Sequence, residues 1–284
     1  MSSAACCSGS EHPGEPKGQT GDLHGLPTYI AEPSNGAEVK GIVVMIPDAF
    51  GWEFVNLRLL SDTFAERLGM RVLLPEFMAG KSADLSALMN MKIVTDKNAS
   101  WLRRIVAGLQ AFRVFVPFMI YNRFAVSRPR IEAFMKSLRE STELPIGLIG
   151  YCWGGRYAIC LAHGTPITSN GKPLIDAAFT AHPSNVVIPA EIENIKLPVS
   201  VAHGTEDIVV SNADAKTIQD IFAKKEKEIA SSMEGEKFEI KMIEGARHGF
   251  AVRGDPDDKA ELGHGQIAED QAVEWFQRWL LSKR

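Results

Sequence analysis

IGLIGYCWGG, residues 146–155, is the stretch from which the architecture of this chain can be inferred. Its first half is apolar, as in a strand that is buried on both faces of a sheet. Its second half places glycines around Cys152, and glycine permits a strand to turn at once into a helix. The stretch therefore predicts a buried parallel strand, a tight turn with Cys152 at its tip, and a helix that begins directly afterwards.

The rest of the chain repeats this alternation of strand and helix. Strands are expected at 41–46, 71–74, 146–149, 177–181, 198–203 and 238–243, and helices at 57–68, 155–162, 213–229 and 267–281, with further helical patterns over 82–140. We therefore predict one α/β domain over residues 23–284, with a mostly parallel central sheet and helices on both faces. Residues 1–22 are rich in Gly, Ser, Pro and charge and are predicted to form a flexible N-terminal tail.

Composition excludes several classes of protein. Hydrophobic residues make up 45% and charged residues 23% of the 284 residues, which suits a soluble domain with a sizeable core. The formal net charge of −4 gives no electrostatic reason to expect a nucleic acid or an anionic membrane as partner, so we expect neither. The four cysteines lack the spacing of a disulfide framework, and no secretory signal is recognisable. We expect a cytoplasmic protein.

The longest apolar stretch, residues 105–121, contains Gln110, Arg113 and Pro117. It therefore lacks the uninterrupted run of about 20 apolar residues that a transmembrane helix needs. We expect either a helix pair that packs on the surface or a helical lid, inserted around residues 100–125, over a large aromatic pocket.

Cys152 is the strongest candidate for a catalytic residue. Residues 150–154, GYCWG, match the G-x-S-x-G nucleophile elbow with cysteine in place of serine. An elbow of this kind places the side chain beside a helix N-terminus, whose dipole favours a thiolate. The backbone N–H of Trp153 would then point at a developing oxyanion. The alternative is a tight turn with a buried structural cysteine.

Partners for this cysteine follow two later strands. Asp207 comes after the fifth predicted strand and His248 after the sixth, so nucleophile, acid and histidine stand in the chain order of α/β-hydrolases. All three lie where the C-terminal ends of parallel strands place a ligand site. Glu206 is the alternative acid. His182, at the end of another strand, either faces the pocket and binds substrate or packs in the core.

These motifs together resemble the dienelactone hydrolase (carboxymethylenebutenolidase-like) family over roughly residues 24–284. The resemblance is carried by GYCWGG at 150–155, GTED at 204–207 and RHGF at 247–250, while CCSG at 6–9 and HPS at 182–184 resemble its fungal branch. It implies an α/β-hydrolase fold and a triad of Cys152, His248 and Asp207. Some members of that branch serve secondary metabolism.

The resemblance also implies roles outside the triad. Asp48, after the first core strand, would contact the resting Cys152 and gate its reactivity, or else only anchor the following loop. The backbone N–H of Ala49 would be the second oxyanion donor. Family members bind a substrate carboxylate through arginines, and Lys81 and Arg253 stand near the two corresponding places.

A cysteine nucleophile restricts the substrate. A thiolate attacks well but also leaves well, so its adduct with an ordinary alkyl ester tends to revert, whereas enol esters, aryl esters and lactones react forward. We therefore expect hydrolysis of a small activated ester or lactone, in secondary metabolism or aromatic degradation, without a metal or organic cofactor. A thiol-redox enzyme with Cys160 as second thiol, and a non-catalytic ligand-binding protein on the same fold, are the alternatives. The oligomeric state is open, and a homodimer is allowed.

Overall fold

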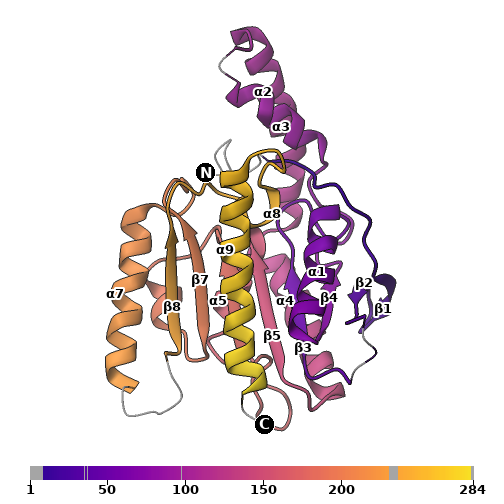
Figure 1. The fold of residues 1–284 in the computed structure, drawn as a ribbon, viewed down its shortest axis with the longest axis vertical. Coiled ribbons are helices and arrows are strands. Elements are labelled where there is room, and N and C mark those ends of the chain that lie inside the picture. The colour runs from indigo at the N-terminus through magenta and orange to yellow at the C-terminus, as the bar shows by residue number, and fades with distance from the viewer. Residues whose placement is uncertain (1–8, 35, 37, 97, 230–235, 283–284) are drawn as a thin grey trace.

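A sheet of eight strands runs through the computed structural model, which describes residues 9–34, 36, 38–96, 98–229 and 236–282 (Figure 1). The strands are β1 (Gln19–Leu23), β2 (Leu26–Ala31), β3 (Ile42–Ile46), β4 (Arg71–Pro75), β5 (Ile146–Tyr151), β6 (Ala177–Ala181), β7 (Val199–Gly204) and β8 (Phe238–Ile243). Their order across the sheet is β1-β2-β4-β3-β5-β6-β7-β8. The strands from β4 to β8 pair in parallel, and β1 and β2 add an antiparallel edge. The predicted mostly parallel sheet is confirmed.

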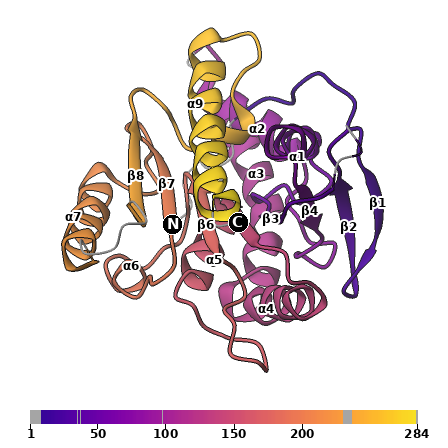
Figure 2. The same cartoon turned by 60° about the horizontal axis from the view of Figure 1, so that its bottom comes forward.

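Helices cover both faces of this sheet. They are α1 (Val55–Leu68), α2 (Ser86–Thr95), α3 (Trp101–Tyr121), α4 (Phe124–Ser141), α5 (Trp153–Leu161), α6 (Ala190–Glu193), α7 (Asn212–Ile229), α8 (Phe250–Arg253) and α9 (Lys259–Phe276), which the π-helical turn η2 (Gln277–Leu281) continues. In Figure 2, α1 and α9 lie on one side of the sheet, and α4 and α5 lie on the other. Every residue of β3 and β5 is buried, because helices pack on both faces of these central strands.

The N-terminal segment differs from the expectation of a flexible tail. Residues 19–23 form β1, and the backbone N–H of Ser10 donates to the carbonyl of Arg253 at 3.0 Å. The Asn56 side chain also donates to the carbonyl of Ser10, at 2.8 Å. Polar contacts of this kind hold a segment without an apolar run, so the tail predicted over residues 1–22 is wrong for residues 9–22. Residues 1–8 lie outside the described residues.

Helices α2 and α3 form a hairpin that projects from one end of the domain (Figure 1). The side chain of Ser100 caps α3 by accepting a hydrogen bond from the N–H of Arg103. Among the described residues, α3 is the one helix whose length and composition would suffice to cross a membrane, and only 22% of its apolar window is buried inside the protein. A helix therefore occupies residues 101–121, and most of its apolar window is exposed, while its role as a lid stays a prediction.

Candidate active site

Cys152 lies at the tip of the turn between β5 and α5. Its backbone has a φ of 49° and a ψ of −109°, and a positive φ is uncommon for a residue with a side chain. Glycines make the turn possible, because a Cβ atom added at Gly150 would lie 2.4 Å from the carbonyl oxygen of Gly154, and one added at Gly154 would lie 2.3 Å from that of Ile46. The predicted elbow therefore exists, with Cys152 at the carboxyl end of the central strand.

His248 and Asp207 form a buried pair beside this cysteine. His248 Nδ1 and Asp207 Oδ2 are 2.8 Å apart, and both side chains are 0% exposed. The second carboxylate oxygen of Asp207 accepts a hydrogen bond from the N–H of Val209 at 2.8 Å. Glu206, the alternative acid, is exposed. The bond at Nδ1 leaves Nε2 of the imidazole to exchange a proton with the sulfur.

Opposing influences set the protonation state of His248. Burial lowers its pKa, but the charge of the Cys152 thiolate and the hydrogen bonds to Asp207 and Cys152 outweigh burial and raise the pKa to about 9. Two groups that interact this strongly titrate as a pair. These interactions therefore favour the imidazolium form of His248.

The loop after β3 forms the other wall of the site. Ala49 lies beside Cys152 and Trp153 on the lining of one cavity, which is where two backbone oxyanion donors would be needed. Asp48 is 0% exposed and accepts hydrogen bonds from the Phe50 N–H at 3.0 Å and from Arg253 Nη1 at 2.6 Å. Burial raises the pKa of Asp48, and the Arg253 guanidinium opposes that effect.

These contacts bear on two predicted roles. Asp48 anchors its loop by accepting a hydrogen bond from the Phe50 N–H, and the Cys152 sulfur makes a weak contact with Ser184 Oγ, at 3.8 Å. The gating of Cys152 by Asp48 stays a prediction. Arg253 is only 1% exposed, pairs with Asp48 and does not line the cavity that holds Cys152. The prediction that it binds substrate is wrong, because a buried guanidinium paired in this way bridges two loops of the protein itself.

The structure also corrects the roles of Lys81 and His182. Lys81 is exposed and lies outside the cavity lining, with its Nζ 5.5 Å from the ring centre of Tyr121. His182 is 0% exposed, and its ring packs 5.0 Å from that of His248 and 5.9 Å from that of Tyr151. Burial lowers the pKa of His182 well below the usual value, so its imidazole is neutral. His182 packs against the ring of His248 and does not line the cavity.

The cavity above Cys152 has a volume of about 410 Å³ and contains five aromatic side chains in its lining. Its lining includes Phe115, Phe118, Met119, Phe124, Trp153 and Tyr157, together with Asn122, Arg123, Arg156, Ser184, Asn185 and Val209. The last two turns of α3 therefore cover Cys152. Phe118 stands edge-on to the Trp153 ring, with 6.3 Å between ring centres, and Trp153 Nε1 donates to the carbonyl of Asn122 at 2.9 Å.

Sequence reasoning missed the polar members of this lining. Arg156 binds Glu191 through Nε and Nη2, at 2.7–3.1 Å, so its charge is already balanced. The exposed Arg123 donates to the carbonyl of Ile120 and has no carboxylate partner among the described residues. The position of Arg156 one turn into the elbow helix could have indicated its place, whereas Arg123 is brought in by the hairpin and had no local signal.

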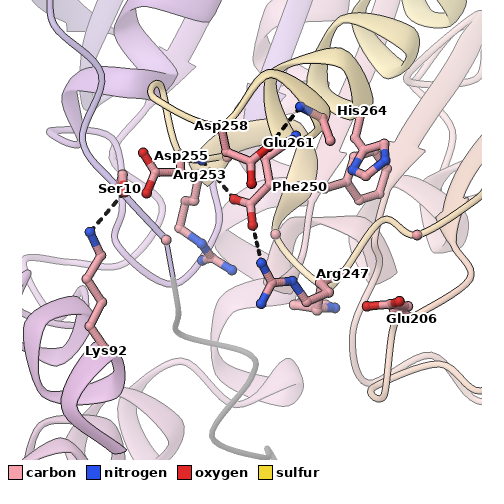
Figure 3. A pocket seen from close by; sticks show the side chains of 16 residues that line it. Ser10, Lys92, Glu206, Arg247, Phe250, Arg253, Asp255, Asp258, Glu261 and His264 are labelled. Atoms are coloured by element: carbon pink, nitrogen blue, oxygen red, sulfur yellow. Dashed lines mark hydrogen bonds and ion pairs between the residues drawn. The ribbon is translucent and has the colours of Figure 1, made fainter. Parts of the chain in front are cut away.

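A second hollow, of about 350 Å³, is lined by the loop that carries His248, by α8 and by the start of α9 (Figure 3). Two of its charged side chains, Arg247 and Glu261, form an ion pair, and Lys92 donates to Ser10 Oγ at 2.9 Å. Its lining does not include Cys152. In the part of the chain that the structure describes, no group of three or more His, Cys, Asp or Glu side chains is arranged to hold a metal ion.

Comparisons with known proteins agree with this geometry. A family model described as "Dienelactone hydrolase family" matches residues 26–280. "Hydrolase tropI" of Talaromyces stipitatus is 27% identical over 285 residues, which is 100% of this chain and 99% of the relative. "Dienlactone hydrolase 1" of Gibberella moniliformis is 23% identical and covers 97% of this chain and 93% of its own length.

A solved structure shares the fold. The dienelactone hydrolase from Anabaena variabilis superposes with a TM-score of 0.52 at 14% identity, covering 94% of this chain and 98% of that one. At this sequence identity, the likeness shows only that the two proteins share the fold.

Proposed function

The chain belongs to the dienelactone hydrolase family and is an ester or lactone hydrolase of the α/β-hydrolase fold, and we propose that it works through a covalent acyl-enzyme on Cys152. The observation that carries this proposal is the buried His248–Asp207 pair, 2.8 Å apart, next to a strained cysteine at the floor of an aromatic cavity. Packing alone gives no reason to place all three at the ends of separate strands.

The proposed reaction has two halves. The Cys152 thiolate attacks the acyl carbon, and the backbone N–H groups of Ala49 and Trp153 stabilise the oxyanion. Collapse of the adduct breaks the bond to the alcohol oxygen, which takes the proton of the His248 imidazolium and leaves a thioester on the enzyme. His248 then removes a proton from water, the resulting hydroxide attacks the thioester, and the acid and the thiol are released.

The cavity supports an activated substrate with an aromatic or bulky apolar part. Phe115, Phe118 and Phe124 surround the position that the acyl or leaving group would occupy, and the exposed Arg123 could pair with an acidic substituent. The thiol's leaving ability favours enol esters, aryl esters and lactones over alkyl esters. A place in fungal secondary metabolism or in aromatic degradation, in the cytoplasm, is part of this proposal and rests on the resemblance.

The two alternative functions have weaker support. A redox role would need Cys160 as second thiol, but Cys160 lies outside the cavity lining, and burial with the nearby Glu191 charge raises its pKa to about 12. A non-catalytic binding protein has no use for the charge pair of His248 and Asp207. Neither alternative requires turnover of an ester.

Mass spectrometry of the enzyme mixed with an excess of p-nitrophenyl benzoate tests the proposal. We expect a benzoyl adduct on the peptide that contains Cys152, the same adduct in Cys160→Ala, and none in Cys152→Ala. Ethyl butyrate should be turned over far more slowly than the aryl ester. Turnover by Cys152→Ala above about a hundredth of wild type would show that another residue is the nucleophile.

A further inference from the structure

The apolar face of α3 is a feature that the proposed chemistry does not explain. It consists of Trp101, Leu102, Ile105, Val106, Leu109 and Phe112, each between 52% and 69% exposed. These residues follow one another at the spacing of a single helix stripe. A contiguous apolar surface of this kind is rare on a soluble protein unless it binds something.

Charge on the two helices of this hairpin is of one sign, and the turn between them contains one acidic residue, Asp96. Arg103, Arg104 and Arg113 are exposed on α3, and neither α3 nor α2 contains an acidic residue. The chain as a whole carries a net charge of −4, so this positive charge is a local property of the projecting hairpin. A helix with a broad apolar face flanked by arginines is typical of segments that lie in the surface of a membrane.

We propose that the α2–α3 hairpin docks the enzyme on an anionic lipid bilayer, with the apolar face of α3 buried among the headgroups and upper acyl chains. The three arginines would contact lipid phosphates, and Trp101 and Tyr121 at the two ends of α3 are the aromatic residues that prefer the membrane–water boundary. The proposal revises the expectation, drawn from the net charge alone, that an anionic membrane is not a partner.

The structure supports lying on the membrane over spanning it. The C-terminal turns of α3 are tied to the domain, because Phe115 and Phe118 line the cavity above Cys152 and the carbonyl of Asn122 accepts a hydrogen bond from Trp153. Spanning would require the helix to leave these contacts and to bury its arginines in hydrocarbon. Docking on the surface leaves both in place and brings the cavity close to lipid-dissolved substrates.

A second copy of the chain is the competing occupant. Leu102, Ile105, Leu109 and Phe112 also have the spacing of a coiled-coil seam. Pairing two such hairpins, however, would bring two sets of arginines together with no acidic residue on either helix to balance them. The charge favours an anionic partner.

Co-sedimentation of the full-length protein with vesicles tests the proposal. We expect binding to an equal mixture of phosphatidylcholine and phosphatidylglycerol, much weaker binding to phosphatidylcholine alone, and release at high salt. Since each arginine near an anionic surface increases partitioning about fivefold, replacing Arg103, Arg104 and Arg113 by Gln should reduce binding about a hundredfold. Leu109→Glu/Phe112→Glu should abolish it.

A matched control replaces exposed apolar residues elsewhere on the domain. Ile167→Glu/Met242→Glu changes two side chains that are 48% and 40% exposed and lie outside the hairpin, and it should bind vesicles like the wild type. Circular dichroism and turnover of a soluble aryl ester report that each variant is folded. Two outcomes overturn the proposal: equal binding by wild type and Leu109→Glu/Phe112→Glu, or a stable dimer that this double variant dissociates in a protein that binds no vesicles.

Discussion

The elbow around Cys152 and the α2–α3 hairpin are built on opposite principles. At the elbow, every backbone approach is close: an added Cβ at Gly154 would meet the carbonyl oxygen of Ile46 at 2.3 Å. In the hairpin, Gly108 has its nearest neighbour, Val94 Cγ2, at 3.8 Å. The elbow holds reacting groups in a fixed, strained arrangement, whereas the hairpin leaves apolar surface open. The contrast shows that the same chain can pack tightly around reacting groups in one region and leave apolar side chains exposed in another.

The acid of the triad gives the largest expected effect on the rigid side of this comparison. Asp207→Asn should lower kcat by about 10⁴-fold, because the imidazole of His248 loses the partner that fixes its tautomer. Glu206→Gln is the matched control and should change kcat little, since Glu206 is exposed. A reversed outcome would identify Glu206 as the acid.

The same variant tests the charge state of the histidine. Because interactions with Cys152 and Asp207 raise the pKa of His248 to about 9, the imidazolium that protonates the leaving group persists up to that pH. The wild-type kcat/KM should therefore fall as pH rises through about 9. Residual activity of Asp207→Asn should fall at a lower pH, since one of the raising interactions is gone. A descending limb at the same pH in both proteins would contradict this account.

The ion pair behind the elbow gives the next effect, on stability. Arg253→Met leaves the carboxylate of Asp48 buried without its guanidinium partner, which typically costs about 3–5 kcal/mol of the free energy of unfolding. The double variant Asp48→Leu/Arg253→Met removes both charges and should recover most of that loss. Urea denaturation of the three proteins measures both quantities. A double variant that is no more stable than Arg253→Met would show that the two charges are not coupled.

Alanine substitutions at Gly154 and Gly108 compare the packing of the elbow and the hairpin, and they should give the smallest changes in the free energy of unfolding. Gly154→Ala should destabilise the protein by about 1–3 kcal/mol and reduce turnover, since α5 must move away from β3. Gly108→Ala should stabilise it by about 0.5–1 kcal/mol, because alanine favours a helix interior and its Cβ has room. Thermal unfolding of both variants gives the sign directly. A destabilising Gly108→Ala would mean that the hairpin is more tightly packed than the described structure has it.

The core strands and the site residues that follow them could be predicted from the sequence, whereas segments without an apolar pattern could not. The strands β6 and β8 were predicted to the residue. β6 is buried along its whole length, whereas β8, at an edge of the sheet, alternates apolar and polar residues. The positions of Cys152, Asp207 and His248 were predicted because each follows a predicted strand. Strands β1 and β2 were missed, since neither QTGDL nor LPTYIA is a continuous apolar run.

Residues whose role depends on loops could not be assigned in this way. Arg253 and Lys81 stand near the expected places in the chain, but only the path of each loop decides whether a cation meets substrate, protein or solvent. The start of α9 was predicted eight residues late, because its first turns are polar and the sign of the start is the capping side chain of Asp258. Arg123 reaches the cavity only because the hairpin folds back onto Trp153.

The bond between Asp48 and Arg253 joins loops that are 205 residues apart in the chain. One segment carries Ala49, the proposed oxyanion donor, and the other follows His248. The ion pair makes the two segments depend on each other. A chimaera that takes either loop from a relative without this pair would lose one of the two partners. The remaining charge would then be buried without a counter-charge. Loop grafting aimed at new substrates should therefore exchange both loops together.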